Sequence, residues 1–453
     1  MGLLDREVLM VVHRAGEPRA SAPPTSPAIP QPRSHVPDPR TAGPALAAAF
    51  GWPDAPCSVL HAKMAPGTAG TILYRLGDRL VLVGHATEES RTGRAVPALG
   101  LHAWEFPDDP ALPRLGEVLS SSGMAAALQA GLAQCWDAVR VRHTRAELVR
   151  YRPGRRATLR VEAWLQEGPG RTLHREVYFA KIYHDAEKAA AVNTVMEALE
   201  RSEPVRAGRV RVAPTVAFLP DVPMIVQAPV PGRPLDLLLD RAARPDRRAA
   251  PAVLAAASAL AAVHEVPPSA GRPRQPAREA ARMEARSDAV ATADPDLGAE
   301  MASVARRLLS VVDGLPAVVG GVHGDCKPSQ FLVGDGVPAL LDFDHAGPGD
   351  PAADVGGFAA SLTQLAVWRS VTARHSSTTA EDSRGWLADL REQFIGEYVA
   401  QAAPTPELDQ RLVYQEAAAL LRKAQRAFAR SPRSPMPSGL TAAARDRLSE
   451  GRG

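Results

Sequence analysis

The most constraining feature of this 453-residue chain is the run His323–Gln330, followed by Asp342-Phe343-Asp344. Phosphoryl transfer requires one carboxylate to orient or deprotonate the acceptor hydroxyl, and a second to hold Mg²⁺ on the phosphates. It also requires an oxygen-bearing side chain to complete the metal shell. Asp325, Asp342 and Gln330 supply these three groups. The run therefore predicts a phosphoryl-transfer site with Asp325 as the base and Gln330 and Asp342 as metal ligands.

The segment between these residues predicts how they come together. Phe331–Val333 and residues 339–341 are short apolar stretches separated by the Gly-bearing turn 334–336, a pattern typical of a β-hairpin. Such a hairpin would return Asp342 to the neighbourhood of Asp325. Lys327, two residues beyond Asp325, is expected to oppose the charge that builds on the transferring phosphate.

At this point the chain resembles the aminoglycoside phosphotransferase and choline kinase families, which are relatives of the protein kinases. The resemblance rests on His323-Gly324-Asp325, Gln330, Asp342, Gly349-Asp350-Pro351 and Asp354, in the family order and at near-family spacing. It implies a two-lobed fold, with ATP and Mg²⁺ as cofactors and a small-molecule hydroxyl as acceptor. A protein kinase is disfavoured, because no activation segment with an Ala-Pro-Glu ending follows Asp342.

Two departures from the family pattern affect the interpretation. Gln330 stands where the family has Asn; its amide oxygen can still reach Mg²⁺ from a slightly more distant backbone. Maltokinases, which are sugar-kinase relatives, also carry Gln there. Lys327 stands where many antibiotic kinases have His. Because of Gln330, a nucleotide-binding pseudokinase with a regulatory or scaffolding role remains the alternative.

The resemblance also implies a lysine for the nucleotide phosphates and a glutamate to pair with it. Lys181 is the candidate, because it lies in the strand-like run Val177–Tyr183 and a compact ammonium suits a point contact to phosphate. An outward-facing lysine on an alternating strand is the other interpretation. Residues 186–198 should form a helix capped by Asp185. On that helix we expect Glu197 to be the partner, with Glu200 close to the same face, whereas Glu187 more simply favours the helix N-terminus by its charge.

Two further segments correspond to nucleotide-binding parts of the family fold. Residues 148–161 predict two strands around a turn with one glycine, where Arg155 or Arg156 and exposed backbone N–H groups would contact phosphate; a plain basic hairpin is equally compatible. Residues 224–235 resemble the segment that joins the two lobes. There the adenine would bind main-chain groups of Gln227 and Ala228.

An internal repeat is the main organisational feature. Residues 63–73 align without gaps on residues 150–160, and both stretches are followed by a second predicted strand. Where the second copy has Lys181, the first has approximately Val83-Gly84-His85. A sheet that keeps the shape but lacks the lysine suggests an N-terminal cap, as maltokinases carry, although Pro-Gly hairpins are common enough for an accidental match.

Composition sets the remaining limits. The hydrophobic content of 45% supports a sizeable core, and the net charge of +3 does not imply a nucleic-acid partner. No signal peptide or membrane span is visible, and scattered cysteines fit a cytoplasmic location. The expected boundaries are 1–44 for a disordered Pro-rich tail, 45–140 for a cap-like domain, 141–232 for the N-lobe, 233–430 for the C-lobe and 431–453 for a flexible tail.

Residues 358–430 should be helical and complete the acceptor pocket. Phe394, Tyr398 and Tyr414 are candidates for stacking on a sugar, although aromatic residues at helical spacing more often belong to a core. The sequence as a whole predicts an α+β, protein-kinase-like fold with an antiparallel-sheet N-lobe, a mostly helical C-lobe and an extra N-terminal α/β cap. We expect ATP- and Mg²⁺-dependent phosphorylation of a sugar, aminosugar or aminoglycoside hydroxyl, with the oligomeric state left open.

Overall fold

A computed structural model describes residues 36–450 except 64–69, 86–92, 134–138, 169–171, 241–246, 272, 274, 313, 335, 373–376 and 404. The chain divides into two compact units. The sheet unit contains Arg6–Ala190 and Thr215–Pro229, and the helical unit contains Ala191–Pro214 and Val230–Gly453. Each unit is described by itself. Among the described residues, none of the helices has the length and apolarity that a bilayer crossing requires.

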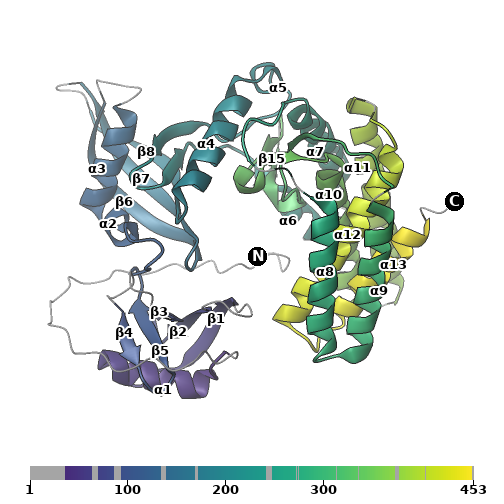
Figure 1. Ribbon diagram of the computed structural model, residues 1–453. Helices are drawn as coiled ribbons and strands as arrows, with labels where there is room; N and C mark the ends of the chain where they lie inside the picture. The colour runs from purple at the N-terminus through teal and green to yellow at the C-terminus, as the bar shows by residue number, and fades with distance from the viewer. Residues whose placement is uncertain are drawn as a thin grey trace. The chain divides into compact units, whose positions relative to one another are not determined.

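The sheet unit begins with helix α1 and a first five-stranded antiparallel sheet in the order β1-β2-β3-β5-β4. Its elements are α1 (Pro39–Phe50), β1 (Cys57–Lys63), β2 (Thr71–Leu76), β3 (Arg79–Gly84), β4 (Arg94–Val96) and β5 (Leu101–Glu105). The carboxylate of Asp38 accepts a hydrogen bond from the Arg40 N–H (2.7 Å), and Gly51 ends the helix at a φ of 69°. α1 lies across one face of this sheet (Figure 1), and a buried cluster including Leu46 and Tyr74 fills the space between them.

A second sheet of the same kind follows, in the order β6-β7-β8-β10-β9. Its elements are α2 (Leu115–Leu119), α3 (Ser121–Leu132), β6 (Val139–Arg152), β7 (Arg156–Glu167), β8 (His174–Tyr183), β9 (Thr215–Leu219) and β10 (Met224–Gln227). Gly131 allows α3 to approach the sheet, because a Cβ atom there would lie 2.3 Å from that of Ala217. Leu73 and Leu80 of the first sheet belong to the same buried cluster as residues of the second.

The two sheets therefore share one strand order, and their registers can be compared directly. Thr71 pairs with Gly84, and Thr158, which aligns with Thr71, pairs with Lys181. Gly84 thus occupies the position in the first sheet that Lys181 occupies in the second, as the sequence alignment predicted. The turn 64–69 of the first hairpin lies outside the described residues.

Helix α4 (Ala186–Arg201) crosses from the sheet unit into the helical unit. Asp185 caps it, since its carboxylate accepts a hydrogen bond from the Lys188 N–H at 3.0 Å. The other helices of the helical unit are α5 (Glu203–Arg206), α6 (Leu235–Asp240), α7 (Ala249–His264), α8 (Pro276–Ala291), α9 (Pro295–Val312), α10 (Ala352–Thr372), α11 (Ser377–Gln401), α12 (Leu408–Arg430) and α13 (Met436–Glu450). Its short strands are β11 (Arg233–Pro234), β12 (Gly320–Val322), β13 (Phe331–Val333), β14 (Ala339–Leu340) and β15 (Gly347–Gly349).

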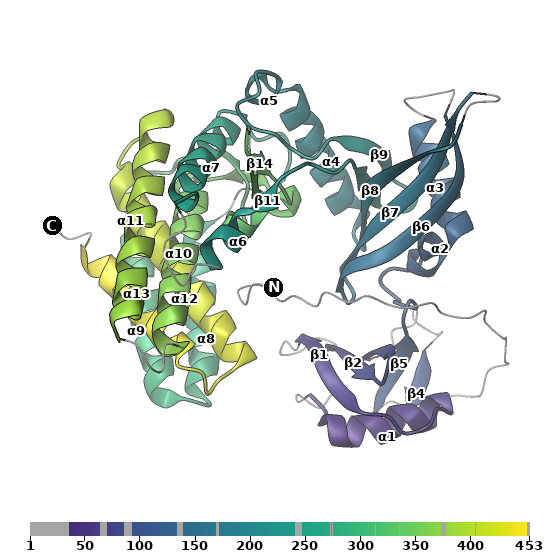
Figure 2. The ribbon, with the colours of Figure 1, turned by 180° about the vertical axis from the view of Figure 1, so that it is seen from behind.

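Helices α8, α9, α12 and α13 form a bundle around one buried cluster (Figure 1), and α7 packs against α11 beside it (Figure 2). Gly356 of α10 allows that helix to touch α12, because a Cβ atom there would lie 2.6 Å from the Glu416 backbone nitrogen. This close approach brings α10 and α12 side by side.

Two expected boundaries are wrong. The N-terminal tail was expected to end at residue 44, but α1 begins at Pro39. Pro39 and Pro44 argued against a helix in the sequence, although Pro is tolerated in the first turn of one. The flexible tail expected at 431–453 is also wrong, because 436–450 form α13. Its Leu440, Ala444 and Leu448 recur every four residues and are buried in the bundle.

Candidate active site

A short hairpin positions the predicted metal ligands, as the sequence indicated. β13 and β14 are antiparallel, with Phe331 opposite Leu340. This register lets the Leu341 N–H donate to the Gln330 carbonyl (2.9 Å), and it brings the side-chain Nε2 of Gln330 to 3.3 Å from Oδ2 of Asp342. The hairpin thus places an amide and a carboxylate side by side.

Asp342 has an unusual backbone conformation, with a φ of 66° and a ψ of 58°. This left-handed region is uncommon for a residue with a side chain. It ends the strand and begins a 3-10 turn, Phe343–His345, so that Asp342 does not continue the alternation of β14. Backbone strain of this kind occurs preferentially at functional sites.

The predicted base, Asp325, lies on the loop between β12 and the 3-10 turn Pro328–Gln330. Its Oδ2 is 3.2 Å from Nζ of Lys327. Burial would raise the pKa of the Asp325 carboxyl, but the Lys327 ammonium and its hydrogen bond, helped by His323 and His345, lower it below its usual value. Asp325 is therefore a carboxylate at neutral pH, in the form that can accept a proton.

The side chain of Asp354 holds the loop that carries Asp325. Its buried carboxylate accepts hydrogen bonds from the backbone N–H of His323 (2.6 Å) and of Gly324 (2.7 Å). Burial opposes its charge, but the hydrogen bond and charge of His264, with smaller contributions from the loop, lower the pKa of Asp354. Asp354 lies in the first turn of α10 and holds the loop of Asp325 in position.

Two histidines connect this loop to its surroundings. His264 lies between Asp354 Oδ2 (3.1 Å from Nε2) and the Tyr398 hydroxyl (2.7 Å from Nδ1), so its contacts are structural. The ring of His323 contacts the Leu341 carbonyl through Nε2 at 2.8 Å, and its Nδ1 accepts from the Asp325 N–H at 3.3 Å. These contacts make Nε2 the protonated nitrogen of His323, and they join the Asp325 loop to the hairpin that carries Asp342.

Asp350, in the Gly349-Asp350-Pro351 segment, anchors helix α12. Its carboxylate is ion-paired with the buried Arg411 and lies 3.5 Å from Nε2 of Gln415. Burial raises the pKa of Asp350 despite hydrogen bonds from the Ala352 N–H, Arg411 and Gln415. The start of α12 is thereby tied to the loop that precedes α10.

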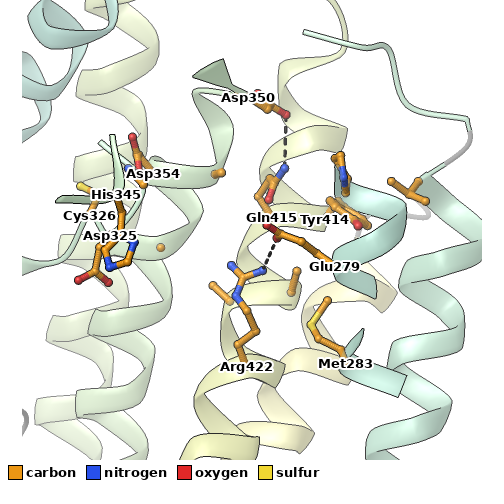
Figure 3. Close-up of a pocket in the computed structure, with 18 of the residues that line it drawn as sticks. Glu279, Met283, Asp325, Cys326, His345, Asp350, Asp354, Tyr414, Gln415 and Arg422 are labelled. Carbon is orange, nitrogen blue, oxygen red and sulfur yellow. Dashed lines mark hydrogen bonds and ion pairs between the residues drawn. The ribbon is translucent and has the colours of Figure 1, made fainter. Parts of the chain in front are cut away.

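A cavity of about 610 Å³ opens beside Asp325 and is lined by residues of α8, α10 and α12 (Figure 3). Tyr414, one of the aromatic candidates for the acceptor, lines it. The other two do not: Phe394 stacks on Phe358 with ring centroids 3.8 Å apart, and Tyr398 is buried against His264. Those two aromatic residues belong to the core, which was the alternative left open by their helical spacing.

The predicted nucleotide-binding residues are distributed over both units. Lys181 lies on β8 between Thr158 and Ile225, Arg155 is exposed at the β6–β7 turn, and Gln227 ends β10 just before Ala228. Glu197 lies on α4 in the helical unit, where it pairs with Arg201 at 3.1 Å and accepts from Asn193 at 2.8 Å. The pairing of Glu197 with Lys181 stays a prediction.

Residues 164–390 match the model of the phosphotransferase enzyme family. The chain belongs to this family. Its enzymes transfer phosphoryl groups, so the residues around Asp325 form the candidate active site of a phosphotransferase that acts on small molecules. Among curated proteins, none matches this sequence.

Several solved structures are similar to this phosphotransferase. A glucosamine kinase (crystal form B) is 19% identical, with a TM-score of 0.46, and the match covers 92% of this chain and 98% of that one. The macrolide 2'-phosphotransferase MphH from Brachybacterium faecium is 18% identical, with a TM-score of 0.41 and coverage of 70% and 97%. The aminoglycoside phosphotransferase APH(4)-Ia is 15% identical, with a TM-score of 0.42 and coverage of 71% and 97%. The family match, together with the antiparallel sheets and the mostly helical second unit, confirms the expected α+β, protein-kinase-like fold.

One residue near the predicted nucleotide loop of this phosphotransferase escaped sequence reasoning. Asp109 is buried in the segment that follows the first sheet, and its Oδ2 accepts hydrogen bonds from the Tyr151 hydroxyl and from the Gly154 N–H, both at 2.8 Å. Asp109 thereby holds the β6–β7 turn that carries Arg155. A lone Asp before a proline gives no sequence signal for a partner 45 residues away.

Proposed function

We propose that this protein transfers the γ-phosphate of ATP, with Mg²⁺, to a hydroxyl of a sugar-like small molecule, as the sequence predicted for a sugar, aminosugar or aminoglycoside acceptor. The observation that carries the proposal is a set of two contacting pairs, one on the loop that Asp354 holds and one between the end of that loop and the end of the β13–β14 hairpin, with His323 joining the loop to the hairpin. Asp325 is paired with Lys327, and Gln330 is in contact with Asp342. Together they provide a base, a cation and two oxygen donors at one site.

In the proposed reaction, a new bond forms between the acceptor oxygen and the γ-phosphorus, and the bond between that phosphorus and the leaving oxygen of ADP breaks. Asp325 orients the hydroxyl and receives its proton. Its lowered pKa makes it a weak base, which suits orientation of the hydroxyl with late proton transfer. Lys327 offsets the negative charge on the transferring group.

The donor set next to Asp325 fits Mg²⁺. Magnesium in phosphoryl-transfer enzymes is held by one or two oxygen donors of the protein, together with phosphate oxygens of the nucleotide and water. Asp342 and Gln330 are adjacent, because they flank the two paired strands of the β13–β14 hairpin. When bound, the ion would neutralise charge on the β- and γ-phosphates. Gln330 can turn its amide oxygen, in place of its nitrogen, towards the metal.

The nucleotide is assigned to the second sheet. Lys181 would contact the phosphates, Glu197 would orient that lysine, Arg155 would cover them from the β6–β7 turn, and the main chain at Gln227 and Ala228 would bind adenine. Because β8 is paired with a strand on each side, the backbone that carries Lys181 is fixed, as a phosphate contact would require. The proposal places the reaction in the cytoplasm, with neither nucleic acid nor a membrane as a partner.

The pseudokinase alternative makes a different prediction for the same residues. In that case Gln330 would prevent metal binding, and Asp325 would have no chemical role. The braced position of Asp325 and the family membership of the chain favour the enzyme.

The test is phosphoryl transfer from Mg-ATP to a panel of neutral, cationic and anionic sugars, aminoglycosides and amino-alcohols, measured by product mass. We expect Asp325→Asn to lower kcat about 1,000-fold, because it removes the proton acceptor. Asp409→Asn, an exposed residue of α12, is the matched control and should retain wild-type rates. Equal rates for the wild type and Asp325→Asn would refute the proposed mechanism.

A further inference from the structure

The cavity beside Asp325 is a long groove. Its wall is formed by α10 and α12, which run in the same direction: Gly356 touches Glu416, and further along Nζ of Lys423 donates to Ser361 Oγ and Gln364 Oε1, both at 3.0 Å. Helix α8 contributes the facing wall. Gln415, at the loop end, and Arg430, at the other, both line the cavity and are separated by about 22 Å along α12, at 1.5 Å per residue.

The charges along this groove are separated by sign. Asp325, Asp350 and Asp354 lie at the loop end. Apart from Lys327, the lysines and arginines that line the cavity lie on α8 and α12, and we call them the basic end: Arg282, Arg286, Arg422, Lys423, Arg426 and Arg430. Figure 3 shows Asp325 and Asp354 on one side of the view, and Arg422 with Glu279 on the other. The groove therefore has an acidic end, where the predicted base Asp325 lies, and a basic end on α8 and α12.

The spacing of the basic residues is regular. Arg282 and Arg286 are four residues apart on α8, and Arg422, Arg426 and Arg430 follow the same interval on α12. Residues at this interval share one face of a helix, and like charges there repel one another. Each of the two helices thus directs a stripe of positive charge towards the same cavity.

Ordinary surface ion pairing does not account for these stripes. Arg422 pairs at 3.4 Å with Glu279, which is the one glutamate among the described residues that line the cavity. For Arg282, Arg286, Arg426 and Arg430, the described part of the chain offers no carboxylate within ion-pair distance, and all four are exposed. An anion bound between the helices would relieve the repulsion, and guanidinium groups are suited to bind phosphate or carboxylate through two hydrogen bonds at once.

We propose that the acceptor is an anionic hydroxyl compound, whose phosphate, sulfate or carboxylate group is bound by the basic end while its hydroxyl lies at Asp325. This inference rests on the proposed function, which it narrows. Gly357 lies against the Cys326 carbonyl at the loop, and Gln364, the partner of Lys423, is about 10 Å further along α10. The acceptor must therefore be at least about as long as a disaccharide.

The same charges disfavour the aminoglycoside included in the sequence prediction. A polycationic antibiotic would place its ammonium groups against the arginines of α8 and α12. Repulsion of this kind is an effective means of rejecting a wrong ligand. Of the acceptors predicted from the sequence, the sugar remains, and it is narrowed to a sugar acid or a sugar phosphate.

The inference can be tested with a matched pair of acceptors, lactobionate and lactitol, which differ mainly in a carboxylate at one end. We expect kcat/KM to be at least about tenfold higher for lactobionate, which is the size of one good charge-assisted hydrogen bond. The double variant Arg282→Gln/Arg426→Gln should reduce this preference towards one. Arg278→Gln is the matched control, because Arg278 is an exposed arginine of α8 that does not line the cavity.

A second measurement separates failure of this inference from failure of the proposed function. The fluorescence anisotropy of the trisulfonated dye pyranine is followed with the nucleotide site saturated by Mg-ADP. We expect dye binding to weaken about tenfold in the double variant, and not in Arg278→Gln. If no acceptor is phosphorylated but this loss is seen, the anion site stands and the proposed function fails. Preference for lactitol or an aminoglycoside, or dye binding equal in all three proteins, would overturn the anion site.

Discussion

The first and second sheets have the same strand order, and each has a helix across one face, yet they differ at two places. In the first sheet, the position opposite Thr71 is Gly84; in the second, the equivalent position opposite Thr158 is Lys181. The chain also connects the third and fourth strands differently. Residues 85–93 suffice in the first sheet, whereas residues 184–214 in the second include α4 and α5.

This difference shows which parts of the second sheet are needed for folding and which are additions. A five-stranded antiparallel sheet under a helix buries its apolar face without a lysine and without α4, as the first sheet demonstrates. The lysine and the helix that follows it are therefore candidates for function. Replacing them should affect activity more than stability.

The largest expected effect is on Lys181. Lys181→Met should lower kcat/KM at least about 100-fold, because the proposed contact of its ammonium with the nucleotide phosphates is lost, while the thermal midpoint changes little. Phosphoryl transfer and thermal unfolding are measured on the same samples, with Lys188→Met, the nearest other lysine, as control. Full activity in Lys181→Met would remove the functional distinction between the two sheets.

A second prediction concerns the residue that links the sheets. Asp109→Ala leaves the buried Tyr151 hydroxyl and the Gly154 N–H without their acceptor, so the free energy of unfolding should fall by about 2–3 kcal/mol. The KM for ATP should rise, because the β6–β7 turn is no longer held. Chemical denaturation and nucleotide titration measure the two effects.

Asp108→Ala is the control for this change, since Asp108 is the exposed neighbour of Asp109. A variant of Asp109 that loses stability without a change in KM would show that the first sheet supports the fold of the second but not its nucleotide turn.

Whether a feature of this molecule could be predicted from the sequence depends on how far apart in the chain the interacting residues lie. The loop residues Asp325, Lys327 and Gln330 and the hairpin to Asp342 could be predicted, because local spacing and turn residues determine them. Asp109 and the basic end could not, since each depends on elements that meet only in the folded chain. The four-residue spacing of Arg422, Arg426 and Arg430 was visible in the sequence, but it identifies a helix face and not what that face covers.

The smallest expected effect compares a buried tyrosine of each sheet at high pH. Burial, followed by the charges of Cys57 and Asp38, raises the pKa of Tyr74 from 10.0 to about 12, and its hydroxyl donates to the Pro37 carbonyl at 2.8 Å. The folded protein thus favours the neutral phenol. The stabilisation is fully present below pH 10.0, the unfolded value, and is lost as the pH rises towards about 12.

As the pH rises from 10.0 to about 12, the free energy of unfolding should therefore fall less in Tyr74→Phe than in the wild type. Burial and the Asp109 carboxylate also raise the pKa of Tyr151, so Tyr151→Phe provides the parallel measurement in the second sheet. Urea unfolding at several pH values detects both. Identical pH profiles for Tyr74→Phe and the wild type would contradict the raised pKa in the first sheet.

Helix α13 limits where the protein can be truncated. Glu416 of α12 is buried and is neutralised by Arg391 of α11 (Nε to Oε1, 2.6 Å) and by Arg447 of α13 (Nε to Oε2, 2.9 Å). A shortened chain ending at Arg430 would retain every predicted catalytic residue. It would also leave this carboxylate with one of its two cations and uncover the apolar surface beneath Leu440 and Leu448. Limits chosen from the catalytic residues alone would therefore cut through the helical core.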